Sequence, residues 1–196
     1  LGIGLYAEVA GAPVCREYIE VDIDGATTEL PALVGKQQPP LLLLNDEDHA
    51  YAKIRLDERS LKTVLEGLST LEESLPRALV WGATWDMTRD AEMSATDFVR
   101  LVLANIGDET DAWGVTRIPA SAALAVNAFS DPSDRGALKA EWEEGLRVLF
   151  LAAEAGSDHQ LTFARNYAAA ARSDAALEQL IGLLDGSITV EGLAVD

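Results

Sequence analysis

The sequence predicts an α+β protein in which a small antiparallel β-sandwich precedes an all-α stacked helical array, or α-superhelix. Two observations predict this class. Up to about residue 57, apolar and polar residues alternate with the period of two that half-buried strands show. Beyond it, apolar residues recur at the helical spacings i, i+3, i+4 and i+7. We therefore expect a β-sandwich domain at residues 1–57 and a helical domain at residues 58–196, truncated at its C-terminus.

The first domain is expected to contain about five short strands. Ile19, Val21 and Ile23 alternate with carboxylates, and Asp24-Gly25 predicts a tight hairpin turn because glycine accepts a positive φ. The strands follow from short apolar or alternating runs bounded by turn residues. They are predicted at Ile3–Leu5, Ile19–Ile23, Thr27–Leu30, Leu41–Leu44 and Tyr51–Leu56.

The second domain is expected to contain about seven helices joined by short loops. Ser94 stands three residues before Asp97, which predicts a helix N-cap, and Pro119 should kink or split the helix that contains it. The short loops favour antiparallel neighbours, as in a stacked, repeat-like array. The helices are predicted at residues 61–68, 75–89, 94–106, 112–129, 138–153, 159–172 and 175–184.

Charge and composition exclude several classes of protein. The chain has 196 residues, of which 33 are acidic and 15 basic, and its formal charge is −18. Binding to nucleic acid or to an anionic membrane requires clustered basic residues, which are missing here. The apolar runs are far shorter than the roughly 18–20 residues of a membrane span. Cys15 is the single cysteine, so no internal disulfide is possible. We expect a cytoplasmic protein with no nucleic-acid or membrane partner.

A search for catalytic motifs finds none. Neither His49 nor His159 begins an H-E-x-x-H sequence, and no glycine-rich phosphate loop or G-x-S-x-G elbow is present. The run Asp46-Glu47-Asp48 could hold a calcium ion, but a solvated hairpin tip explains it more simply. We therefore assign no catalytic residue, no metal ligand and no cofactor to this chain.

One polar and aromatic cluster is dense enough to consider as a site. It lies on the second predicted helix, where residues four apart share a face. One hypothesis makes it the wall of a ligand groove. The other, which we favour, makes it a buried helix whose ends are tied to neighbours by ion pairs. The cluster consists of Arg77, Trp81, Trp85, Asp86 and Arg89.

Three segments resemble a known family. Tyr51 to Asp57, Leu75 to Trp81 and Trp85 to Met93 are similar to segments of the zinc aminopeptidases of the aminopeptidase N (gluzincin) family, in the form found in actinobacteria. The first resembles the strand that ends the family's β-sandwich. The other two resemble the first helices of its C-terminal domain, which endoplasmic-reticulum aminopeptidases share. The resemblance covers essentially the whole chain and is most specific in residues 41–106.

The resemblance implies a role other than catalysis for this chain. Members of the family remove N-terminal residues from peptides, using a zinc ion held by an H-E-x-x-H helix and a downstream glutamate. This sequence contains none of those motifs, so the chain should be inactive alone. The resemblance implies that it caps the catalytic domain of the same parent chain and shapes access for peptide substrates, with zinc in the parent enzyme. The formal charge of −18 suggests an acidic wall that faces the peptide N-termini. The alternative is a free-standing helical protein-binding module without peptidase activity.

Overall fold

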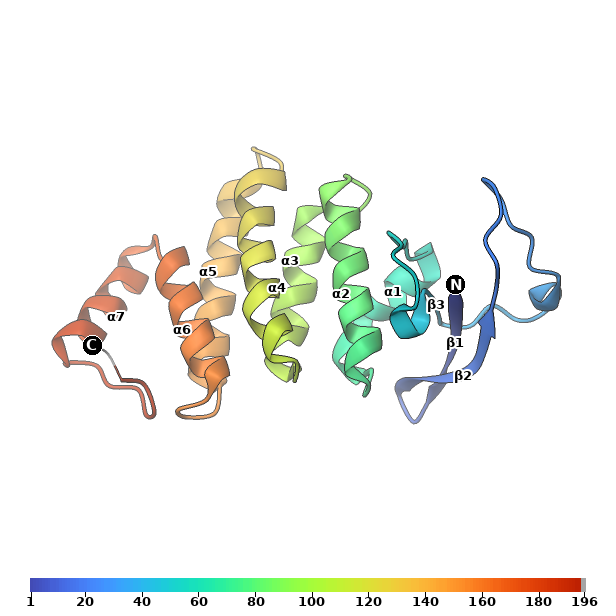
Figure 1. Cartoon of the computed structure of the whole chain (residues 1–196). Helices are drawn as coiled ribbons and strands as arrows, with labels where there is room; N and C mark the ends of the chain where they lie inside the picture. Colours follow the sequence, from blue (N-terminus) through green and yellow to red (C-terminus); the bar gives the residue numbers. More distant parts are fainter. Residues whose placement is uncertain (195–196) are drawn as a thin grey trace. The chain divides into compact units, whose positions relative to one another are not determined.

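The α+β class is confirmed by a computed structural model, which describes residues 1–194 (Figure 1). Three strands are followed by seven α-helices in this part of the chain, with short 3-10 turns between them. The residues form two compact units, which divide after Asp90. Each unit is described by itself below. The predicted domain boundary at residue 57 stays a prediction, although the change from strands to helices occurs there.

The first unit contains one antiparallel sheet of three strands. These are β1 (Gly2–Val9), β2 (Ala12–Glu20) and β3 (Leu41–Leu44), and β1 lies in the middle. Ile3 pairs with Ile19 on one side and with Leu44 on the other. Every residue from Gly2 to Tyr6 is buried, so the central strand forms the core of this unit.

Two of the predicted strands are not formed. Residues 27–30 and 51–56 have no strand structure, so residues 1–194 hold one sheet, whereas a sandwich needs two. The turn of the β1–β2 hairpin lies at Ala10 and Gly11, both with positive φ, and not at Asp24-Gly25. In the segment 51–57, Ile54 and Leu56 are buried. The alternation there reflects an extended chain that rests on the core through its side chains, without a neighbouring strand.

Two helices complete the first unit. They are α1 (Glu58–Gly67) and α2 (Ser74–Arg89). Asp57 caps α1, because its carboxylate accepts the backbone N–H groups of Arg59 at 3.0 Å and Ser60 at 3.1 Å. The Ser60 hydroxyl in turn accepts the backbone N–H of Leu42 at 2.9 Å, which ties α1 to β3.

The second unit is all helical. Its helices are α3 (Ala95–Asn105), α4 (Ala112–Leu124), α5 (Arg135–Ala152), α6 (Asp158–Ala170) and α7 (Asp174–Asp185). The α4 helix runs unsplit through Pro119 and continues as a π-helical turn, η5 (Ala125–Phe129). Its core is built from large side chains that are at most 1% exposed, namely Phe98, Phe150, Phe163 and Tyr167.

Serine and aspartate caps set where these helices begin. The predicted cap at Ser94 is confirmed, because its hydroxyl accepts the N–H of Asp97 at 3.0 Å. Asp111, Ser157 and Ser173 cap α4, α6 and α7 in the same way. Within residues 1–194, no helix combines the length and the apolar character that crossing a bilayer requires.

Candidate functional site

The predicted cluster on α2 divides into a buried and an exposed part. Arg77 and Trp81 are 5% and 6% exposed, whereas Trp85 is half-buried. The Asp86 and Arg89 side chains lie at the surface, 3.7 Å apart. The structure therefore places the five side chains on one helix, but only part of the set is accessible to a ligand in the first unit.

Arg77 holds the chain that leads into α2. Its guanidinium donates to the carbonyl oxygens of Leu71 at 2.6 Å and Glu72 at 2.9 Å. These carbonyls lie just before the helix. The buried positive charge is therefore bound to backbone dipoles, as a buried charge requires. The role of the cluster, as a peptide groove or as a structural element, stays a prediction.

Asp90, at the end of α2, binds the segment that carries the Tyr51–Asp57 motif. Its carboxylate accepts from Lys53 and from Arg55. The hydrogen bond from Lys53, helped by the charges of Lys53 and Arg55, lowers the pKa of Asp90. The two cations of the motif thus attach an irregular segment to the end of a helix.

The acidic loop after β3 is only partly solvated. Glu47 and Asp48 are exposed, as expected for a hairpin tip, but Asp46 is 5% exposed, which corrects that expectation. Its carboxylate accepts the Tyr6 hydroxyl at 3.0 Å. Burial raises the pKa of Asp46, and the bond from Tyr6 only partly opposes this effect. Burial and the adjacent Asp46 also raise the pKa of Tyr6, so the phenol stays a donor.

Strained backbone turns Asp46 inward. Asn45, Glu47 and Asp48 all have positive φ, which is uncommon for residues other than glycine. The Asn45 side chain stabilises the loop by donating to the carbonyl of Ala50 at 2.7 Å and accepting its N–H at 3.0 Å. A Cβ at Gly4 would lie 2.0 Å from an Asp46 carboxylate oxygen, so only glycine fits beneath this loop.

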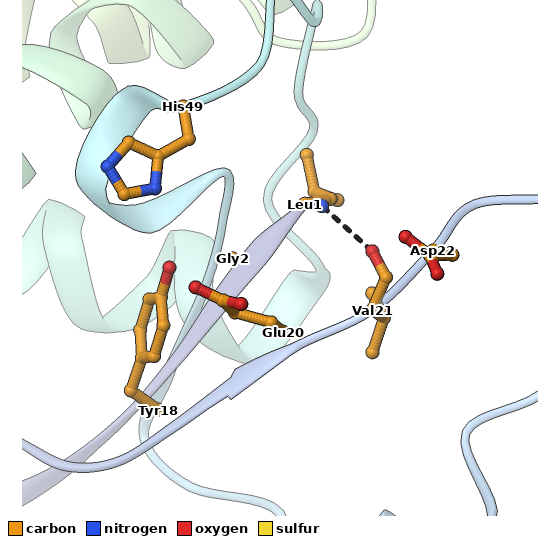
Figure 2. A pocket seen from close by; sticks show the side chains of 7 residues that line it. All are labelled: Leu1, Gly2, Tyr18, Glu20, Val21, Asp22 and His49. Carbon is orange, nitrogen blue, oxygen red and sulfur yellow. Dashed lines mark hydrogen bonds between the residues drawn. The ribbon is translucent and has the colours of Figure 1, made fainter.

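An open pocket of about 470 Å³ lies beside the same loop (Figure 2). Tyr18 and Glu20 of β2 and His49 of the loop point into it. The amino group of Leu1 also lines it and donates to the Val21 carbonyl at 2.8 Å. In a longer polypeptide this group would be a peptide N–H, so the charge of the pocket depends on residues before Leu1. For that reason we assign it no ligand.

The described residues, 1–194, do not fit a zinc ion. Within residues 1–194, no three side chains among His, Cys, Asp and Glu come together as ligands. His159 bonds through Nε2 to the Glu109 carbonyl at 2.8 Å and packs edge-on against Phe163. No reaction step through zinc is therefore derived for these residues.

Sequence reasoning missed three polar contacts that organise the units. These are Tyr6 with Asp46, Asp90 with Lys53 and Arg55, and Glu143 with the start of α7. Glu143 accepts the Ser173 N–H at 3.0 Å and hydroxyl at 2.6 Å. Each contact joins residues about 30 or more positions apart, and no local pattern signals such a pair.

Fold and local geometry together describe an α+β protein whose later part is entirely helical. The chain belongs to the family described as ERAP1-like C-terminal domain, which matches residues 41–196. It is also 49% identical over 197 residues to a protein of Streptomyces lividans named aminopeptidase N. That match covers all of this chain but only 23% of the relative, so the chain spans less than a quarter of that protein's length. The resemblance stated from the sequence is thereby confirmed.

Proposed function

We propose that this chain is a non-catalytic C-terminal region of a zinc-dependent aminopeptidase that removes N-terminal residues from peptides. The observation that carries the proposal is the 49% identity to an aminopeptidase N along the whole chain. The absence of H-E-x-x-H from the sequence supports a role outside the chemistry. Most of the relative lies outside the match, which leaves room there for a catalytic domain that holds the zinc ion.

Within that enzyme, the chain caps the catalytic domain of the same polypeptide and limits which peptides enter. Its helices offer a rigid, strongly acidic surface, since the chain carries a formal charge of −18. A negative wall raises the local concentration of cationic peptides and of their free amino termini. The cytoplasm, where cysteines stay reduced, is the compartment that we propose for it.

One observation favours the alternative of a helical protein-binding module. An apolar groove of about 440 Å³ runs along α6 and α7, where Leu184 is 71% exposed and Leu161 is 39% exposed. Apolar patches of this kind often mark a contact with another protein or segment. The two proposals differ in what precedes Leu1 in the gene. A start codon close upstream favours the module, and several hundred codons that include H-E-x-x-H favour the peptidase.

The activity test compares two lengths of the protein. The 196-residue chain is incubated with zinc and an aminoacyl-anilide beside the polypeptide extended upstream through the H-E-x-x-H segment. We expect hydrolysis that a chelator abolishes from the extended polypeptide, and none from the chain alone. Chelator-sensitive turnover by the chain alone would overturn the proposal. The capping role is tested separately, since this chain should bind a catalytic domain that is expressed apart from it.

A further inference from the structure

A small cavity in the second unit combines cationic and amide side chains. Its volume is about 60 Å³, and residues of α4, η5, α5 and α6 line it, together with Arg172 just after α6. Trp142, which is 4% exposed, forms part of its apolar wall. Aspartate and glutamate are missing from the described residues that line it, although the chain holds 33 of them. The polar lining consists of Asn127, Lys139, Asn166 and Arg172.

The two asparagines are held in place by their own helices. Asn127 lies in the π-helical turn and donates one amide N–H to the Ala123 carbonyl at 2.8 Å. Asn166 of α6 does the same to the Thr162 carbonyl at 2.8 Å. An amide group carries two N–H donors, so each side chain retains a second one. π-helical turns are rare and occur frequently at functional sites.

The positive charges of the cavity are not used elsewhere in the described structure. Within residues 1–194, neither Lys139 nor Arg172 forms a salt bridge or a side-chain hydrogen bond. Glu143 is close enough to the Arg172 guanidinium for the two charges to interact. Its carboxylate oxygens, however, are bound to the Arg172 backbone N–H, the Ser173 N–H and the Ser173 hydroxyl.

Glu143 is therefore committed to the start of α7. Burial tends to raise its pKa, but the bonds from Ser173 and from the Arg172 backbone outweigh burial, so the pKa lies below its usual value. Its single charge cannot balance two cations. Lys139, Arg172 and Glu143 together therefore carry a net charge of +1, in a chain whose formal charge is −18.

We propose that this cavity binds a small oxyanion, either phosphate or the carboxylate of a small acid. The Lys139 ammonium and the Arg172 guanidinium carry only donors, and each asparagine amide retains one N–H donor beside its acceptor oxygen. Charged N–H groups of this kind bind oxyanions strongly. One water molecule occupies about 30 Å³ in the liquid, so the volume admits a group of a few heavy atoms. The proposal does not depend on the peptidase assignment, because it concerns residues of this chain alone.

A purely structural role for the cations is the competing explanation. The cavity lies near the C-terminal end of α6, where backbone carbonyls carry partial negative charge that a nearby cation stabilises. Such a role needs no anion. Titration with anions therefore separates the two explanations.

The test titrates the ¹⁵N-labelled 196-residue chain with sodium phosphate and, separately, with sodium acetate. Sodium chloride keeps the ionic strength constant and serves as the reference anion. We expect saturable shifts of the side-chain amide signals of Asn127 and Asn166 and of the Trp142 indole. A stronger response to phosphate identifies a tetrahedral oxyanion, and a stronger response to acetate identifies a carboxylate. Saturation by neither anion overturns the proposal.

Variants locate the binding. Lys139→Gln and Arg172→Gln should each weaken the binding about tenfold or more, because each removes a charged hydrogen bond. Arg165→Gln is the matched control, since it removes one charge from α6 at a residue that lines the apolar groove instead. Equal binding by all three variants overturns the proposal. If a charge variant loses its helical circular dichroism, Ala123→Leu replaces it, because leucine there should fill the cavity and abolish the shifts.

Discussion

Residues 1–90 and the helices from α3 onward are stabilised by different kinds of contact. In the first unit, residues 21–40 and 45–57 lie in loops and short turns, which makes 33 residues between β2 and α1. Specific polar pairs hold several of these segments. In the second unit, regular helices satisfy their own backbone and pack through large apolar side chains. Where backbone groups lack a regular partner, side chains must supply one.

This difference in the kind of contact predicts which substitutions destabilise each unit. The first unit depends on single hydrogen bonds to buried groups such as Asp46 and Arg77. The second depends on summed contacts around Phe150, Phe163 and Tyr167, with caps that mark the helix starts. Five substitutions can break or sharpen this contrast, and they follow from the largest expected effect to the smallest.

Phe163→Ala should have the largest effect. Phe163 is 1% exposed, and its loss leaves a cavity within the helical core. We expect the free energy of unfolding of the second unit to fall by about 3–5 kcal/mol. Urea unfolding followed by circular dichroism measures it. Trp113→Ala is the control, since Trp113 is 68% exposed and rests mainly against Arg117. Equal losses of unfolding free energy in the two variants would contradict the claim that apolar packing stabilises the second unit.

Tyr6→Phe should destabilise the first unit by about 1–3 kcal/mol, because it removes the Tyr6 hydroxyl donor from a buried carboxylate and leaves the backbone bond from Glu47. Chemical unfolding measures the loss. The ring stays in place, so the change isolates the hydroxyl. An unchanged midpoint would show that the Tyr6–Asp46 contact does not support the loop.

The same pair predicts a dependence on pH. The pKa of Asp46 is raised in the folded state above its ordinary value of 3.8. The folded state therefore binds this proton more tightly, and the associated stability is complete below about pH 3.8 and is lost as the pH rises through the raised pKa. The Asp46→Asn variant carries a neutral side chain at every pH. Its free energy of unfolding, relative to that of the natural chain, should therefore increase as the pH rises through the raised pKa of Asp46. A constant difference between the two proteins would contradict the assignment.

Ser173→Ala should cost about 1 kcal/mol in the second unit. It removes the N-cap of α7, whose hydroxyl accepts the N–H of Ala176 at 3.2 Å, and one of the bonds to Glu143. Thermal unfolding measures the loss. Ser187→Ala provides a matched control, because Ser187 lies beyond α7 and caps no helix start.

Asp90→Asn should have the smallest effect on stability, because salt bridges at the surface contribute little. In the natural chain, the ion pairs of Asp90 contribute stability above about pH 3.8. This contribution is lost as the pH falls through the lowered pKa of Asp90. The clearer result should be faster amide hydrogen exchange at Ile54 and Leu56, since Lys53 and Arg55 lose their anchor. Unchanged exchange would show that apolar burial alone holds this segment.

The helical part of the fold was predictable and the sheet was less so. All seven helices were expected close to their observed bounds, because the apolar period and the caps are local signals. Residues 51–56 alternate as a strand does, yet they pair with no strand. Alternation reports which side chains are buried, and pairing depends on a second segment that no local pattern identifies.

The candidate site shows the same limit. The spacing of Arg77, Trp81, Trp85, Asp86 and Arg89 correctly placed them together on one helix. The burial of Arg77 against the carbonyls of Leu71 and Glu72 depends on how the chain turns before α2. The ion pairs of Asp90 with Lys53 and Arg55 depend on residues 35 or more positions away. The cavity with Lys139 and Arg172 likewise joins residues from three helices.

Local patterns were thus sufficient for the fold class, the helices, the caps, the acidic character and the family resemblance, since each depends on residues a few positions apart. Tertiary structure alone decided that three strands form the sheet, that Asp46 turns inward to Tyr6, and that Lys139 and Arg172 share a cavity beside the π-helical turn η5. The reason is physical. Strand pairing, the burial of a charge and the formation of a cavity are contacts between segments far apart in the chain, and their energies exist only once those segments meet.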